Sequence, residues 1–322
     1  MVFSPLLGFY LMLIIVLLMV ISMSSPFTMW VCLELNMLMF LPIMSSEPGL
    51  ALENTLKYFL IQSFASILFL IGFIMATVFS SVLFFTSFMG LMLKLGAAPF
   101  HGWFISILKS SSMWVLMLLS TLQKCAPLIM TLSFNASPQI LGLFLVANLM
   151  VAYFSLSASV TVNKVLALSS MVNLGWFFVS VQCSLKAFFS YFSIYAFLLF
   201  GVVSLCSKYS PTTFSSLNNM GMGDGAVLIF TFMSLGGLPP LLGFLGKLLV
   251  LKTTLIHMSL SLTLLLVYTS LMVLNIYISR LFFMLANGPS MKTGLGSHKM
   301  SAEAGMFGVS LGGFTMLMMI AI

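Results

Sequence analysis

The chain has 322 residues, and only 5% of them are charged, against roughly 25% in an ordinary globular protein. Hydrophobic residues make up 61%, the mean hydropathy is +1.21, and the net charge of +7 comes from basic residues that are scattered singly. A soluble enzyme, a disordered chain and a nucleic-acid-binding protein are therefore excluded, because each needs many more polar or clustered basic side chains. The composition predicts an all-α polytopic membrane protein.

A helix needs about 20 apolar residues to cross the hydrocarbon core of a bilayer. Dividing the chain at polar clusters, Pro and Gly predicts eleven spans within one membrane domain, residues 1–322. In chain order the spans are 3–24, 27–44, 57–79, 81–110, 113–134, 138–159, 163–182, 185–207, 226–252, 256–286 and 305–322. Glycine and proline residues predict that the fourth and ninth spans, 81–110 and 226–252, are interrupted.

The two interrupted spans hold matching places in the chain. The first ten spans form two sets of five, about 3–134 and 138–286, and the C-terminal helix 305–322 follows them. Because five is odd, the second set would cross the membrane in the opposite sense to the first. Interrupted spans at matching positions of an inverted repeat are typical of the ion site of a transporter.

The basic residues predict the orientation. Those expected on the N-terminal side of the membrane are Lys57, Lys109, Lys164, Lys208, Arg280, Lys292 and Lys299. The opposite side holds Lys186 and Lys252. Because basic loops face inward, the N-terminus is expected inside and the C-terminus outside.

Four ionisable residues lie inside the predicted spans: Glu34, Lys94, Lys124 and Lys247. Each would cost about 2.5–3.5 kcal/mol if central and unpaired, so they must pair, contact internal water or be partly neutral. Static pairing accounts for Glu34 and one lysine at most, and snorkelling suits helix ends better than Lys94 or Lys124. The pattern favours a proton relay.

Helix-breaking residues surround these charges. They are Pro99, Pro127, Gly236, Gly237, Pro239 and Pro240. Non-helical backbone at membrane depth is tolerated only inside protein or beside a wet cavity, although a simple proline kink is the alternative for any one of them.

Three other polar residues are candidates for the relay or for a cap at the break. His101 either joins the relay or caps carbonyl groups at the break, and the sequence does not decide between these two readings. Ser169 and Asn173 share one face of their span and are further relay candidates. No metal or cofactor site is predicted, because no two His, Cys, Asp or Glu residues have ligand spacing.

Several segments carry a family resemblance. They are CLELNML at 32–38, LKYF at 56–59, MLKLGAAPFH at 92–101, LQKCAP at 122–127 and SLGGLPP at 234–240, with Gly243, Phe244 and Lys247 after them. Over about residues 27–252, the chain closely resembles the chain 2 family of mitochondrial NADH–ubiquinone oxidoreductase (respiratory complex I), in its animal form.

The resemblance implies a function. Glu34 and Lys94 would be the charged pair of a first half-channel, Lys124 the connecting lysine and Lys247 the lysine of the second broken helix. The chain would translocate protons across the mitochondrial inner membrane, with the N-terminus in the matrix and the C-terminus in the intermembrane space. NADH, flavin, iron–sulfur clusters and ubiquinone would bind other subunits, so the expected partners are other membrane subunits and the lipid bilayer.

Two other functions share some of these features. A subunit of a multi-subunit sodium/proton antiporter would carry the same charged residues, whereas a purely structural membrane scaffold would not need four buried charges.

Overall fold

The computed structural model describes residues 3–23, 25–47, 51–78, 84–133, 138–214, 216, 222–257 and 259–286. The chain divides into two compact units, Met1–Val151 and Ala152–Ile322. The predicted all-α membrane fold is confirmed. The predicted loop 287–304 and the predicted helix 305–322 lie outside the described residues.

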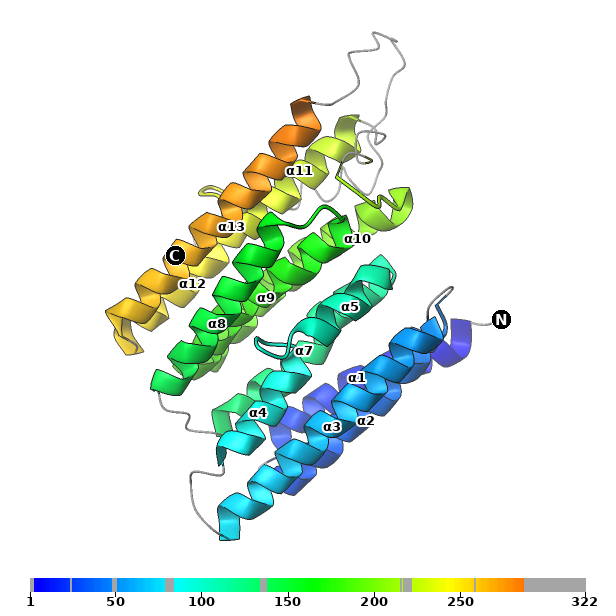
Figure 1. Ribbon diagram of the computed structural model, residues 1–322, viewed down its shortest axis with the longest axis vertical. Helices are drawn as coiled ribbons and strands as arrows, with labels where there is room; N and C mark the ends of the chain where they lie inside the picture. The colour runs from blue at the N-terminus through cyan, green and yellow to red at the C-terminus, as the bar shows by residue number, and fades with distance from the viewer. Residues whose placement is uncertain are drawn as a thin grey trace. The chain divides into compact units, whose positions relative to one another are not determined.

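In the first unit, α1, α2 and α3 lie side by side, and α3 packs along α4 (Figure 1). The helix α7 contacts α1, α2 and α4, so it brings its polar residues against several neighbours. The helices are α1 (Phe3–Ser22), α2 (Pro26–Ser45), α3 (Ala51–Val78), α4 (Phe84–Leu95), α5 (Gly102–Ser110), α6 (Met113–Ser120), α7 (Leu122–Met130) and α8 (Pro138–Ser157), with a short 3₁₀ turn at Thr131–Ser133. The last residues of α8 belong to the second unit.

The second unit is built around α9, which contacts α10, α12 and α13. Because every residue of α9 from Val165 to Val181 is buried, the polar residues in that stretch face protein and not lipid. The helices are α9 (Val162–Cys183), α10 (Leu185–Tyr209), α11 (Met222–Gly236), α12 (Leu242–His257) and α13 (Leu260–Ala286).

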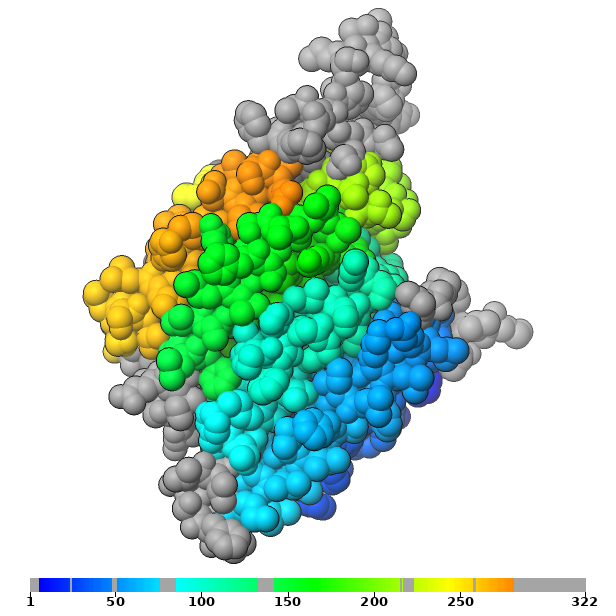
Figure 2. Space-filling model, viewed as in Figure 1, coloured from blue at the N-terminus to red at the C-terminus, as the bar shows by residue number. Residues whose placement is uncertain are grey.

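The outer helices expose apolar side chains that suit a lipid environment. On α3, which is blue in Figure 2, Leu52 and Leu60 are 73% and 63% exposed. Within the described ranges, six helical stretches are long and apolar enough to cross a membrane. They are Pro26–Ser45, Ala51–Met75, Met113–Met130, Val162–Cys183, Leu185–Tyr209 and Leu260–Arg280.

Several helices begin at serine caps. Ser25 accepts a hydrogen bond from the Thr28 amide, and Pro26 occupies the first position of α2, where its missing N–H costs nothing. Ser184 caps α10 in the same way through the Ala187 amide. These side chains replace the water that would otherwise satisfy the first amides of a helix.

The interruptions predicted in spans 81–110 and 226–252 are present, and both begin with the same backbone structure. At the end of α4, Gly96 N–H donates to Leu93 and Ala97 N–H donates to Met92. At the end of α11, Gly237 and Leu238 make the equivalent bonds, to Ser234 and Met233. Each is a Schellman motif, which needs a left-handed residue, and the glycines have φ of +64° and +88°.

The prolines lie beyond these glycine caps. Pro99 lies between α4 and α5, and Pro239 and Pro240 lie between α11 and α12. Each half-helix therefore ends at its glycine, and the prolines prevent the helix from resuming immediately.

The break predicted at Pro127 is wrong. The helix α7 continues through Pro127, and the span 113–134 is interrupted instead at Thr121, where φ is −116° and ψ is −87°. Pro127 is the sixth of the nine residues of α7, and the helical geometry is interrupted before the helix, at Thr121. The proline then removes one helical hydrogen bond without ending the helix.

Replacing Gly96 with alanine is expected to destabilise the subunit. A Cβ atom would lie 2.7 Å from Cβ of Phe104, and the left-handed φ costs about 1–2 kcal/mol for an L-residue even without that contact. The matched control is Gly102→Ala, because a Cβ on Gly102 has no heavy atom within 4 Å and its effect should stay within about 0.5 kcal/mol. Thermal inactivation of the assembled protein measures both, and equal midpoints would contradict this prediction.

Candidate functional site

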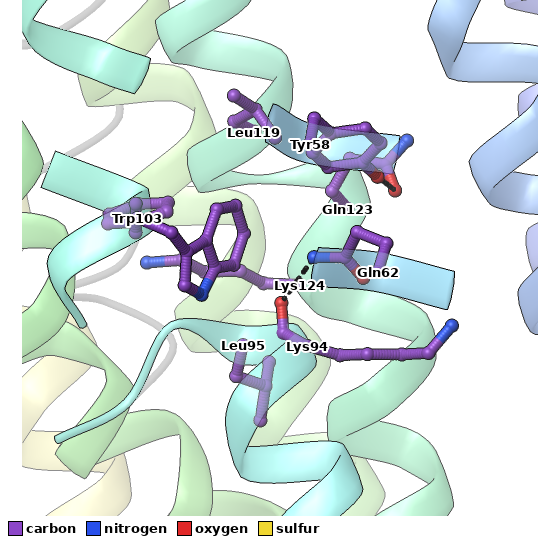
Figure 3. Close-up of a pocket in the computed structure, with 9 residues that line it drawn as sticks. Tyr58, Gln62, Lys94, Leu95, Trp103, Leu119, Gln123 and Lys124 are labelled. Carbon is purple, nitrogen blue, oxygen red and sulfur yellow. Dashed lines mark hydrogen bonds between the residues drawn. The ribbon is translucent and has the colours of Figure 1, made fainter. Parts of the chain in front are cut away.

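Two buried lysines on neighbouring helices form the centre of the first unit. Lys94 on α4 is 6% exposed and Lys124 on α7 is 2% exposed. Figure 3 shows their side chains extending in opposite directions, so that the two ammonium groups are held apart. Nζ of Lys124 lies 4.5 Å from the ring centroid of Phe104, a cation–π geometry that stabilises the buried charge.

Glu34 is half-buried on α2, and its charge acts on both Lys94 and Tyr58. In the described part of the chain, the ion pairs within 4 Å are Lys57 with Glu53 and Lys208 with Asp224. Glu34 and Lys94 thus interact across a longer distance than a direct salt bridge.

Amide and hydroxyl groups connect the helices around Lys94. The Asn36 amide donates to Oε1 of Gln123 at 2.8 Å, and the Tyr58 hydroxyl donates to the same oxygen at 3.2 Å. One helical turn after Tyr58, the Gln62 amide donates to the backbone carbonyl of Lys94 at 3.2 Å (Figure 3). This network joins α2, α3, α4 and α7.

A small cavity lies among these groups. Its volume is about 10 Å³, the space that one water molecule needs. It is lined by Tyr58, Gln62, Lys94, Leu95, Trp103, Phe104, Leu119, Gln123 and Lys124. The polar lining makes the cavity suitable for water, since genuinely empty cavities are apolar.

The second unit holds Lys247 on α12, and its side chain is directed at the break that precedes it. The Lys247 ammonium donates to the Gly236 carbonyl at 2.7 Å and lies 5.8 Å from the Trp176 ring centroid. A Cβ on Gly237 would lie 2.8 Å from the same nitrogen, so glycine at this position leaves room for the lysine. The carbonyl at the end of a half-helix is thus paired with a buried cation.

The two relay candidates on α9 differ in what they contact. Asn173 accepts a hydrogen bond from the Tyr191 hydroxyl at 3.0 Å. Ser169 donates to the Leu166 carbonyl of its own helix, as serines in membrane helices commonly do. Asn173 therefore belongs to an interhelical contact, whereas the Ser169 hydroxyl is bonded locally.

His101 lies in the linker before α5, half-buried, with Nδ1 3.1 Å from the Pro99 carbonyl. It is not among the residues that line the cavity around Lys94 and Lys124. This geometry agrees with the alternative that His101 caps a carbonyl group at the break.

Several residues of the site were not predicted from the sequence. Tyr58 and Gln62 stand one turn apart on α3, and this spacing of two polar residues in an apolar helix was the available signal. No sequence pattern indicates Trp103, Trp176 or Tyr191, since aromatic residues are common throughout this chain. Within the described ranges, no three His, Cys, Asp or Glu side chains are placed to hold a metal ion.

An all-α membrane chain with buried lysines at interrupted helices has the features of an antiporter-like membrane subunit. Residues 75–273 match the family described as NADH:quinone oxidoreductase/Mrp antiporter, TM. The chain belongs to the NADH–ubiquinone oxidoreductase chain 2 family. The chain 2 of Anopheles gambiae is 32% identical over 98% of this chain and 97% of its own, and that of Artemia franciscana is 34% identical over 70% and 73%.

Solved structures share the fold. A chain of respiratory complex I from Thermus thermophilus superposes with a TM-score of 0.81 and 23% identity, covering 96% of this chain and 77% of that one. A chain of an Mrp complex from a Dietzia species gives 0.75 and 14% identity, covering 92% and 72%.

Proposed function

We propose that this chain is a proton-translocating membrane subunit of NADH–ubiquinone oxidoreductase in the mitochondrial inner membrane. The observation that carries the proposal is the burial of Lys94, Lys124 and Lys247 at or beside interrupted helices, in a chain of the complex I chain 2 family. Redox chemistry elsewhere in the complex would drive the movement of protons.

In the first unit, Glu34 and Lys94 act as the charged pair, and Lys124 takes the proton onward. An ammonium group releases a proton to a neighbouring acceptor and becomes an amine, which then accepts the next proton. In the second unit, Lys247 exchanges a proton at the α11–α12 break. The Lys247 ammonium donates to the Gly236 carbonyl, so proton release requires that contact to loosen.

The electron carriers would lie on other subunits. NADH, flavin, iron–sulfur clusters and ubiquinone would bind there, and this chain would contact other membrane subunits and lipid. Its contribution is a path for protons through the bilayer.

Purification of the native complex tests the function. The complex that contains this chain is expected to couple NADH oxidation by ubiquinone to proton movement after reconstitution into sealed vesicles. Sodium-driven proton flux in a complex without NADH oxidation would contradict the proposal and support a multi-subunit sodium/proton antiporter.

The proposed orientation places the N-terminus in the matrix and the C-terminus in the intermembrane space. Ser22 and Ser46 lie near opposite ends of α2, and both are exposed with hydroxyls bonded to carbonyls of their own chain segment. With a membrane-impermeant thiol reagent, Ser46→Cys should react in inside-out vesicles and Ser22→Cys in mitoplasts. Reaction of the two cysteines from the reverse sides would overturn the orientation.

A further inference from the structure

A row of exposed side chains runs along one face of α13. Leu264, Tyr268 and Leu271 are 60%, 59% and 59% exposed, and Asn275 is exposed as well. Their spacing of four, three and four residues is that of the contact seam between two paired helices. These four residues are called the α13 seam below.

The packing of α13 within its own unit uses other positions. Leu266, Val273 and Tyr277 are buried, and the Tyr277 ring lies 5.7 Å from the ring of Phe232 on α11. The helix contacts α9, α11 and α12, and it lies at the outside of the second unit, where it is orange in Figure 2. The described helices of the unit therefore leave the α13 seam uncovered.

Asn275 places an amide group on this apolar face. At 1.5 Å per residue, it lies about 22 Å from the first residue of α13 and about 16 Å from the last, within the hydrocarbon core. The hydroxyl groups of Ser270 and Ser279 on the same helix donate to carbonyl groups one turn earlier. Among the residues that the structure describes, none forms a hydrogen bond with the Asn275 side chain.

An amide at this depth needs a partner, because lipid tails neither donate nor accept hydrogen bonds. Asparagine has two N–H donors and an acceptor oxygen, so complete pairing takes a group that both donates and accepts. A second carboxamide, from Asn or Gln, is such a group, whereas a hydroxyl that is bonded to its own helix can only accept. The predicted helix 305–322 of this chain contains neither Asn nor Gln.

We propose that the α13 seam binds a membrane-spanning helix of a neighbouring subunit, and that a carboxamide side chain of that helix pairs with Asn275. Leu264, Tyr268 and Leu271 supply the apolar contact, and the amide pair sets the register in which the two helices meet. The inference rests on the proposed function, which places this chain beside other membrane subunits. It identifies the surface through which one of them binds.

The test replaces Asn275 with leucine in the complex. Leucine is close to asparagine in size and more favourable in lipid, so insertion of the subunit is not impaired. Loss of the amide pair should increase the fraction of subunit that dissociates in mild detergent about threefold to tenfold, the effect of one interhelical hydrogen bond in a membrane. Native electrophoresis over a series of detergent concentrations measures it. If Asn275→Leu dissociates no more readily than the native chain, the amide faces lipid and the inference is wrong.

Controls separate this inference from the function on which it rests. Ser279→Ala should dissociate like the native chain, because Ser279 is exposed on the same helix but bonded to its own backbone. Complexes of Asn275→Leu that stay assembled should keep the native ratio of protons moved to NADH oxidised. Native dissociation of Asn275→Leu, with pumping lost in Lys124→Met, would overturn the role of the seam and leave the proposed function standing. Increased dissociation of Asn275→Leu, with full pumping by Lys124→Met, would overturn the proposed function alone.

Cross-linking identifies the partner without any variant. A diazirine-containing leucine, incorporated during synthesis, takes the place of Leu264 and Leu271 with little change in shape. After illumination of native membranes, mass spectrometry of α13 peptides is expected to find adducts with a membrane-spanning segment of another subunit that contains Asn or Gln. Adducts confined to lipid, to residues 287–322 of this chain or to a segment without Asn or Gln would overturn the inference.

Discussion

Replacing Lys124 with methionine is expected to abolish coupled proton translocation in the assembled complex. Methionine keeps the length and the apolar stem and deletes the amine that lies over the Phe104 ring. Removal of a positioned proton-transfer group typically slows a reaction about 10²–10⁴-fold, and a loss of at least the lower value is expected here. The ratio of protons moved to NADH oxidised, in reconstituted vesicles, measures it.

Arginine at position 124 distinguishes proton exchange from fixed charge. Its guanidinium keeps the cation that lies against Phe104, yet it cannot release its proton because its pKa stays above about 12. Both Lys124→Met and Lys124→Arg should therefore lose pumping, as should the same pair at Lys247. An arginine variant that pumps normally would show that the lysine supplies only charge.

A surface lysine provides the matched control for these replacements. Lys109 is exposed at the end of α5, so Lys109→Met should leave both pumping and assembly unchanged. NADH oxidation by an artificial acceptor should persist in every assembled variant, because the electron carriers would lie on other subunits.

Reversal of either charge in the Glu34–Lys94 pair is expected to reduce the amount of assembled subunit sharply. Glu34→Lys places two cations near each other in a buried region, and Lys94→Glu places two acids there. Two charges of the same sign repel most strongly where water is excluded, and Lys94 is only 6% exposed. Quantitative native electrophoresis of the assembled complex measures the loss.

The double reversal tests whether the two residues act on each other. Since Glu34 acts on Lys94 electrostatically without forming a direct salt bridge, the coupling energy should be modest, about 0.5–3 kcal/mol. Glu34→Lys combined with Lys94→Glu should therefore recover part of the assembled complex. If the losses from the two single reversals simply add in the double variant, Glu34 and Lys94 do not act as a pair.

Much of this site was predictable from the sequence because the chain has very few charged residues. With so few charged residues in the sequence, each one inside an apolar span stood out, and Lys94, Lys124 and Lys247 are buried as expected. The interruptions were also predictable, because glycine and proline disrupt helices through local backbone effects that need no partner.

Other features depended on contacts between helices. Pro127 predicts a break in the sequence, but α7 passes through it and the backbone is interrupted at Thr121 instead. Likewise, nothing in the spacing of Lys94 and Lys124 indicates that their side chains extend in opposite directions (Figure 3).

The sequence by itself determined the membrane environment, the helical class, the two interruptions that follow Gly96 and Gly237, and the three buried lysines. All of these follow from composition and local stereochemistry, which act within one segment of chain. Only the tertiary structure decided that Asn36 and Tyr58 meet on one oxygen of Gln123, and that Lys247 pairs with the Gly236 carbonyl. Hydrogen bonds and charge interactions between helices depend on distances of a few ångströms, and packing sets those distances for residues far apart in the chain.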